Sequence, residues 1–408
     1  MRGDCVPKHV LLLLMTHLHQ KWTTSRRHHI HFWGYNLLMG RIKAAKDGRQ
    51  LALYMKHYSI YGKAWEENFL GKRVINTMET KNIQHVASSG LEDYGKGSNA
   101  MDGPEWKHSR DITKPIFSRS ELSDVERLDF HIDRLVNFIP RDGSMIDLQD
   151  LTNKMANANL RTNYFIDSSS EILLGKSMDL QLNDDDSNDA VDYLTAFQAC
   201  LVGLGNRLHN YTGIQIKRAL EKISGTEAKS ESRYVLIHEL AKQIQDPIQL
   251  RSQILQIWVP SRDTTALVVN SSIFQLAQRP EIWEQLRVES LAIGDEPIIF
   301  EPLPSLKLFK YVVYETLRLQ APPSRVQKVA VRDTILPVGG GPDDFVPFLG
   351  GPRIYLAQQR VLTHCVQVLV RLTREFSRIE NQDPVMESVE MWRLLPESRN
   401  GIKVALFI

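Results

Sequence analysis

Pro347-Phe348-Leu349-Gly350-Gly351-Pro352-Arg353-Ile354-Tyr355-Leu356-Ala357 is the stretch of this sequence that decides the fold. Its two prolines and two adjacent glycines indicate a loop. Apolar residues then recur every three or four positions, which predicts a helix with one buried face; they are Leu362, Val366, Leu369, Leu372 and Phe376. The sequence therefore predicts a glycine-containing loop that runs directly into a buried helix.

An acidic and a basic residue stand three positions apart in Glu315-Thr316-Leu317-Arg318, shortly before Pro322-Pro323. On a helix, residues at this spacing lie on one face and are close enough to pair. Any surface helix can contain such a pair, so its meaning depends on the motifs around it.

A long helix is predicted from about Pro247 to Gln278, before Arg279-Pro280 ends it. Within it, Asp263 and Thr264 place a carboxyl group beside a hydroxyl group, which together can relay and donate a proton. Pro260 removes one backbone hydrogen bond of this helix at a cost of about 3 kcal/mol. We expect a bend there rather than a break.

Pro104-Glu105-Trp106-Lys107-His108-Ser109-Arg110 has proline early and an acid in the first turn, as helices often begin. Trp106 and Arg110 are four residues apart, and an indole N–H and a guanidinium both suit a carboxylate. The alternative is that both side chains serve packing alone. Earlier in the chain, Val74-Ile75-Asn76 predicts a short strand.

Taken in chain order, these four motifs resemble those of the cytochrome P450 monooxygenases. The haem-binding loop of that family reads Phe-x-x-Gly-x-Arg-x-Cys-x-Gly, and Phe348, Gly351 (or its neighbour Gly350) and Arg353 fit it. Tyr355 stands where the family has the cysteine that ligates the haem iron. The final glycine of the loop is replaced by Ala357.

The resemblance implies the cytochrome P450 fold, mainly α with small β-sheets, and haem b as the cofactor. It implies that Asp263 and Thr264 deliver protons to oxygen at the iron. It also implies that Trp106, Arg110 and Arg353 are propionate partners of the haem.

For Phe348 and Gly351 the resemblance implies cofactor-binding positions in the haem loop. For Glu315 and Arg318 it implies a buried structural ion pair that supports this loop. In the family, a Pro-Glu-Arg string supplies a third partner to that pair, and none follows Arg318 here. The sequence thus predicts that part of the region before the loop is missing, with an internal deletion between Gly341 and Phe348. An incompletely satisfied buried charge cluster would cost several kcal/mol, on the order of that estimated for buried ion pairs.

Four strings narrow the resemblance to the fungal alkane and fatty-acid hydroxylating branch, from about residue 60 onward. They are Arg73-Val74-Ile75-Asn76-Thr77-Met78, Asp102-Gly103-Pro104-Glu105-Trp106, Pro115-Ile116-Phe117-Ser118-Arg119 and Leu336-Pro337-Val338-Gly339-Gly340-Gly341-Pro342. This branch implies terminal hydroxylation of an aliphatic small molecule, an NADPH-dependent reductase partner and an endoplasmic-reticulum membrane address.

Three functions remain open. The first is a family member that has lost normal haem-thiolate catalysis. The second is a working oxygenase or peroxidase with Tyr355 as axial ligand, since tyrosinate ligates haem in catalases, or a gene model that omits part of a working enzyme. The third is a non-catalytic protein that binds lipid or a partner. Cys365, on the apolar helix face, is expected to be a small buried hydrophobe.

The bulk composition limits partners and location. A net charge of +2 gives no reason to expect nucleic acid as a partner, and three scattered cysteines favour a reduced compartment. Residues 1–40 are predicted to be a short apolar and basic membrane-proximal segment. Its apolar run, Val10 to Met15, is far shorter than the roughly 20 residues that span a membrane. We therefore expect weak, peripheral membrane contact, and a single domain over residues 41–408.

Overall fold

The computed structural model describes residues 11–16, 26–27, 34–69, 72–95, 103–118, 124–152, 164–177, 206–224, 235–294, 298–322, 325–332, 334, 336–337, 347–392 and 395–408. The chain divides into two compact units. Unit 1 comprises Met1–Arg110, Tyr314–Gln358 and Glu387–Arg399; unit 2 comprises Asp111–Val313, Gln359–Met386 and Asn400–Ile408. The single domain predicted over residues 41–408 is a statement about independent folding. The division into compact units does not test it, so it stays a prediction.

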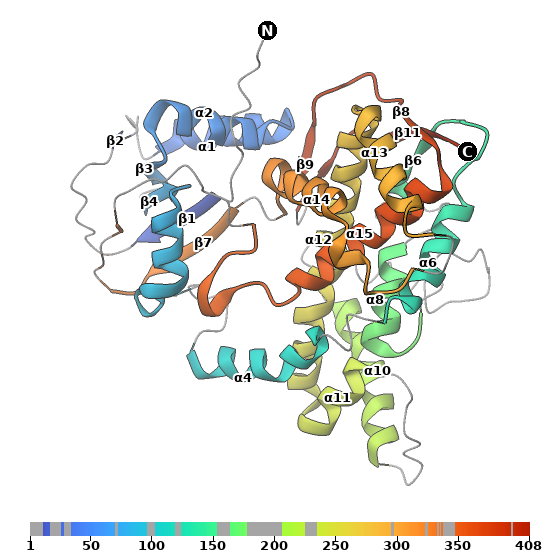
Figure 1. Cartoon of the computed structure of the whole chain (residues 1–408). Helices are drawn as coiled ribbons and strands as arrows, with labels where there is room; N and C mark the ends of the chain where they lie inside the picture. Colours follow the sequence, from blue (N-terminus) through green and yellow to red (C-terminus); the bar gives the residue numbers. More distant parts are fainter. Residues whose placement is uncertain are drawn as a thin grey trace. The chain divides into compact units, whose positions relative to one another are not determined.

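Helices make up most of the described part, and the strands are short (Figure 1), which confirms the expectation of a mainly α fold with small sheets. The α-helices are α1 (Tyr35–Lys46), α2 (Gln50–Tyr61), α3 (Thr80–Gln84), α4 (Gly103–Thr113), α6 (Glu126–Asn137), α7 (Leu148–Thr152), α8 (Tyr164–Leu174), α10 (Asn206–Ser224), α11 (Leu236–Gln243), α12 (Pro247–Ala277), α13 (Pro280–Leu291), α14 (Lys307–Gln320) and α15 (Gln358–Glu375). Shorter helices are η2 (His85–Ser89, a π-helix), η3 (Leu91–Asp93), η4 (Lys114–Phe117), η5 (Leu303–Ser305) and η6 (Gly351–Arg353).

Unit 1 contains a six-stranded sheet with the order β2-β3-β4-β1-β7-β5. Its strands are β1 (Leu11–Thr16), β2 (Arg26–Arg27), β3 (Ala64–Phe69), β4 (Lys72–Thr77), β5 (Tyr94–Gly95) and β7 (Arg325–Ala330). The predicted strand around Val74 is confirmed as β4. A separate pair, β9 (Glu390–Trp392) and β10 (Pro396–Ser398), belongs to the same unit.

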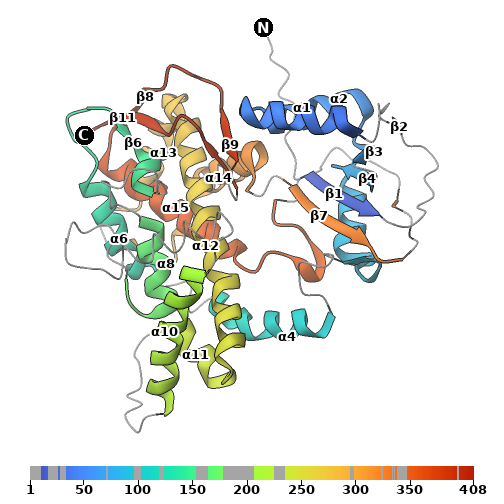
Figure 2. The same cartoon turned by 180° about the vertical axis from the view of Figure 1, so that it is seen from behind.

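The apolar run near the N-terminus forms strand β1, a finding that the sequence interpretation did not include. β1 pairs antiparallel with β4, with Leu14 opposite Ile75, and parallel with β7 (Figure 2). Its backbone groups are therefore used inside a sheet. No helix in the described residues is both long and apolar enough to cross a membrane.

Unit 2 is built around α12, and the predicted helix from Pro247 is confirmed. Asp246 caps it, because its side chain accepts hydrogen bonds from the backbone N–H groups of Ile248 and Gln249 at 3.1 and 3.2 Å. The helix runs unbroken through Pro260, and the bend expected there stays a prediction. A three-stranded sheet, β6 (Ile146–Asp147), β11 (Lys403–Phe407) and β8 (Arg378–Asn381), completes the unit.

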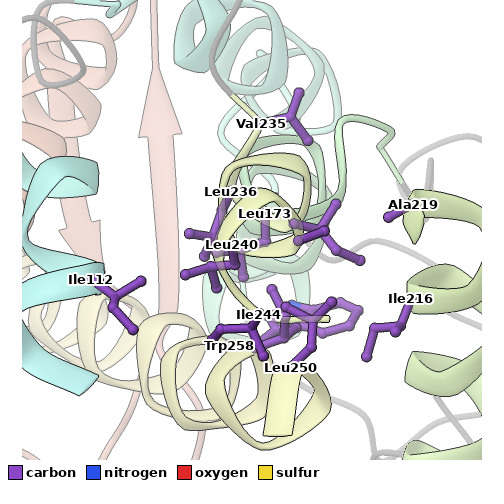
Figure 3. Close-up of a cluster of buried hydrophobic side chains, with 13 residues drawn as sticks. Ile112, Leu173, Ile216, Ala219, Val235, Leu236, Leu240, Ile244, Leu250 and Trp258 are labelled. Atoms are coloured by element: carbon purple, nitrogen blue, oxygen red, sulfur yellow. The ribbon is translucent and has the colours of Figure 1, made fainter. Parts of the chain in front are cut away.

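The core of unit 2 includes a cluster of buried side chains from α4, α8, α10, α11 and α12 (Figure 3). Trp258 of α12 lies among them, 1% exposed, with Leu240 and Ile244 of the α11 region. The predicted buried face of α15 is also confirmed: Leu362, Val366, Leu369, Leu372 and the following Phe376 are all buried.

Candidate functional site

The loop before α15 is closed by its own backbone. The Tyr355 N–H donates to the Phe348 carbonyl at 3.1 Å, and the Ile354 N–H donates to the Gly351 carbonyl at 3.1 Å. The rings of Phe348 and Tyr355 lie parallel, with centroids 6.3 Å apart and planes at 3°. Tyr355 therefore lies just before the start of α15. The backbone N–H of Gln358, the first residue of that helix, donates to the Tyr355 carbonyl at 3.3 Å.

Gly351 is the glycine that this loop requires. It has φ +62°, and a Cβ added there would lie 2.5 Å from the Ala87 carbonyl oxygen and 2.8 Å from Ser88 Cβ. Gly350 is extended, with open space around it. Of the two glycines that fit the motif, the structure therefore selects Gly351.

The partner of Gly351 is η2, a π-helix, and sequence reasoning missed it because no residue type marks such a turn. π-Helical turns are rare and recur at functional sites. Leu349, two residues before Gly351, has φ +59°. Among the described residues it is the one non-glycine residue with a positive φ. Its side chain packs on the cluster that contains Ile83 and Val86, and this packing offsets the backbone strain.

Gly351→Ala is expected to destabilise the protein by about 2–4 kcal/mol, because it adds left-handed strain and a clash with a backbone carbonyl. The measurement is the free energy of unfolding in urea. Gly350→Ala is the matched control and is expected to change stability by less than about 0.5 kcal/mol. Equal effects of the two variants would contradict the assignment of Gly351.

Three side chains that were predicted to serve one cofactor meet in unit 1. The Arg353 guanidinium carbon lies 3.8 Å from the centroid of a Trp106 ring, and that of Arg110 lies 5.6 Å from it. Arg110 also donates to the Ile354 carbonyl at 3.0 Å. The predicted start of α4 is confirmed, and the propionate role of the three side chains stays a prediction.

The pair of Glu315 and Arg318 forms on α14, but it is not buried. Arg318 donates two hydrogen bonds to the Glu315 carboxylate, of 2.7 Å from Nε and 2.6 Å from Nη2. The Glu315 side chain is 55% exposed and that of Arg318 is 23% exposed. The expectation of a buried cluster was wrong, because more than half of the Glu315 side chain is open to water. Water therefore solvates this carboxylate and screens its charge. The cost expected for an unsatisfied buried charge therefore does not apply.

Glu315→Gln is expected to lower the free energy of unfolding by less than about 1 kcal/mol, as for other exposed ion pairs. The substitution keeps the shape and helix propensity of the side chain, so chemical denaturation isolates the loss of charge. A loss of several kcal/mol would mean that the pair supports the fold as a buried cluster does.

Asp263 and Thr264 lie on α12 in unit 2. The Thr264 side chain is half-buried. The side chain of Asp263 lies outside the described part, as does the predicted deletion between Gly341 and Phe348. Both assignments stay predictions.

Comparisons with known proteins identify relatives of this chain. The sequence matches the family model described as Cytochrome P450 over residues 50–337. It is 29% identical to the cytochrome P450 monooxygenase fsdH of Fusarium heterosporum over 481 residues, 95% of this chain and 83% of that protein. It is 28% identical to iccC of Talaromyces variabilis, covering 92% and 90%, and 29% identical to cytochrome P450 52A10 of Candida maltosa, covering 85% of each.

The chain is a mainly helical protein with small sheets, in which a glycine-containing loop precedes the buried helix α15. The chain belongs to the cytochrome P450 family. The family implies a monooxygenase ancestry, haem as cofactor and a reductase as partner.

Among the described residues, the donor set does not fit a haem-thiolate centre. The resemblance to the family puts the phenol of Tyr355 at the ligand position of the loop. Among the described residues the one cysteine is Cys365, which is fully buried on α15, and burial raises the pKa of its thiol. A thiol in that state does not supply a thiolate. The described part also contains no group of three or more His, Cys, Asp or Glu side chains arranged for a metal ion.

Proposed function

We propose that this chain is a cytochrome P450 monooxygenase by descent that has lost normal haem-thiolate catalysis. The carrying observation is Tyr355 at the ligand position of a loop that its own backbone hydrogen bonds close. The electron push that favours O–O cleavage in the family comes from a thiolate. A phenol has an ordinary pKa near 10, so at neutral pH a smaller fraction of it is anionic than of a thiol. It is also a weaker electron donor than a thiolate.

Two comparisons support the proposal. The match to the family model ends at Pro337, before the loop that contains Tyr355. The alignment to fsdH runs over 481 residues, more than the 408 of this chain, so that relative has residues with no counterpart here. A gene copy that is no longer under selection for catalysis accumulates such changes, here the loss of residues and the loss of the ligand.

The ancestral activity that we propose is terminal hydroxylation of an aliphatic small molecule at the endoplasmic-reticulum membrane, with an NADPH-dependent reductase. This finer assignment is based on the four strings that resemble the alkane and fatty-acid hydroxylating branch. The relatives named above come from fungi, which supports the fungal part of it.

The test is the reduced carbon monoxide difference spectrum of the purified chain, its mass verified. We expect no thiolate-type band, since no cysteine occupies the loop, and substoichiometric haem that gel filtration removes. A thiolate-type band would refute the proposal. A stable one-to-one haem complex with a tyrosinate-like spectrum would make Tyr355 a true ligand and favour a working oxygenase or peroxidase. Binding of a fatty acid by haem-free protein would favour the non-catalytic binding protein.

A further inference from the structure

The turn between α1 and α2 is held by a segment from near the other end of the chain. This segment is residues 387–392, which include strand β9 and are called the strap below. The strap belongs to unit 1, whereas Met386 just before it belongs to unit 2. The backbone N–H of Glu390 donates to the Gly48 carbonyl at 3.0 Å, and β9 packs on α1. Glu390 lies 339 residues beyond Leu51, so the contact joins distant parts of the sequence.

The strap supplies a cap that α2 does not have of its own. The N-cap residue of α2 is Arg49, whose side chain makes no capping hydrogen bond, and the first turn contains no acidic residue. A carboxylate oxygen of Glu390 accepts a hydrogen bond from the backbone N–H of Leu51 at 3.2 Å. A carboxylate at this end of a helix satisfies a free N–H group and interacts favourably with the helix dipole. Glu390 therefore caps α2 from outside the helix.

The backbone of the turn approaches the strap closely at Gly48. This glycine has φ +66°, and a Cβ added there would lie 2.6 Å from the Glu390 carbonyl oxygen and 2.6 Å from a methyl carbon of Val389. Arg399 adds two hydrogen bonds: its backbone N–H donates to the Val389 carbonyl at 2.8 Å, and its guanidinium donates to the Ala45 carbonyl at 3.2 Å. The strap therefore fits a turn that has no side chain at this position.

We propose that the strap opens and closes on the α1–α2 turn as one unit, and that Glu390 is the residue that holds it closed. None of residues 387–391 is buried. A segment with few buried apolar contacts opens locally before the rest of a fold does. The chain enters unit 1 at Glu387 and returns to unit 2 at Asn400, so opening of the strap changes one of the chain links between the two units. The device depends neither on haem nor on the proposed function.

The experiment is native-state hydrogen exchange of the full chain, resolved to single backbone amides. In the wild-type chain we expect the amides of Leu51 and Glu390 to exchange through one shared opening, with equal protection. Glu390→Ala should speed exchange at Leu51 at least about fivefold, as the loss of a helix cap does. Glu387→Ala is the matched control on the same strap. Glu387 pairs with Arg49 where both side chains are exposed, so its loss should change the rate less than about twofold.

Two results would overturn the proposal. Different protection of the Leu51 and Glu390 amides in the wild-type chain would show that the strap does not open as one unit, and this measurement needs no variant. Equal effects of Glu390→Ala and Glu387→Ala would show that Glu390 is not the residue that holds the strap. Unchanged protection of the amides of α12, in unit 2, verifies that each variant is folded.

Discussion

Tyr355→Cys, made alone, is expected to leave hydroxylation of a long-chain fatty acid undetectable. The substitution restores the sulfur but not its surroundings. Ala357, which is buried, keeps a methyl group where the family has glycine, and that methyl limits the approach of the loop backbone. Arg110 and Arg353 are already engaged, one with the Ile354 carbonyl and the other over Trp106.

The effect of residues that act as a unit is not additive, so one restored member recovers little of the activity. The measurement is product formation with a reductase and NADPH supplied, beside the carbon monoxide spectrum of the same sample. Tyr355→Phe is the matched control, because it keeps the ring and removes the oxygen; it should be as inactive as the wild-type chain. Turnover by Tyr355→Cys would contradict this expectation, because it would show that Ala357 and the engaged Arg110 and Arg353 do not prevent hydroxylation.

The second large effect is a loss of stability in acid, and it originates in a buried histidine. His364 of α15 is fully buried, which, with Arg360 and His131 nearby, lowers its pKa from 6.5 to about 3. Its Nε2 is in close contact with the hydroxyl of Tyr164 on α8. Burial raises the pKa of that phenol well above 10, so the phenol stays protonated and donates to the neutral imidazole.

The sign follows from the protons bound in each state. Between pH 6.5 and 3 the unfolded chain binds a proton at His364 and the folded protein does not, so stability falls as the pH falls. Above pH 6.5 this contribution is complete and constant. The full drop corresponds to about 4–5 kcal/mol, a large part of a typical stability of about 5–15 kcal/mol.

Urea unfolding followed by circular dichroism, at several pH values from 8 to 4, measures this dependence. His364→Gln keeps a side chain that can accept the Tyr164 hydrogen bond but does not titrate, so its stability should fall less steeply in acid. Asp129 acts in the opposite sense, because burial, the largest cause, raises its pKa. The comparison of the two proteins removes that contribution. Parallel pH curves would contradict the role of His364.

Much of the secondary structure could be predicted from the sequence, because local patterns determine it. The extent of α12 and the stepping of apolar residues in α15 needed no distant contact. The motifs of the loop, of Trp106 and Arg110 and of Glu315 and Arg318 also indicated the family, since each depends on residue type and spacing. The exposure of Glu315 could not be predicted in this way, because burial depends on what the rest of the chain places over a helix.

By itself, the sequence determined the family and the helical elements, and it predicts that Tyr355 occupies the position of the thiolate ligand. Only the tertiary structure decided which glycine the loop requires, because the Ala87 carbonyl that approaches Gly351 is more than 250 residues away in the chain. It also decided that Leu11–Thr16 is a strand. Sequence patterns record which residues can be buried, whereas packing between distant segments determines which of them are.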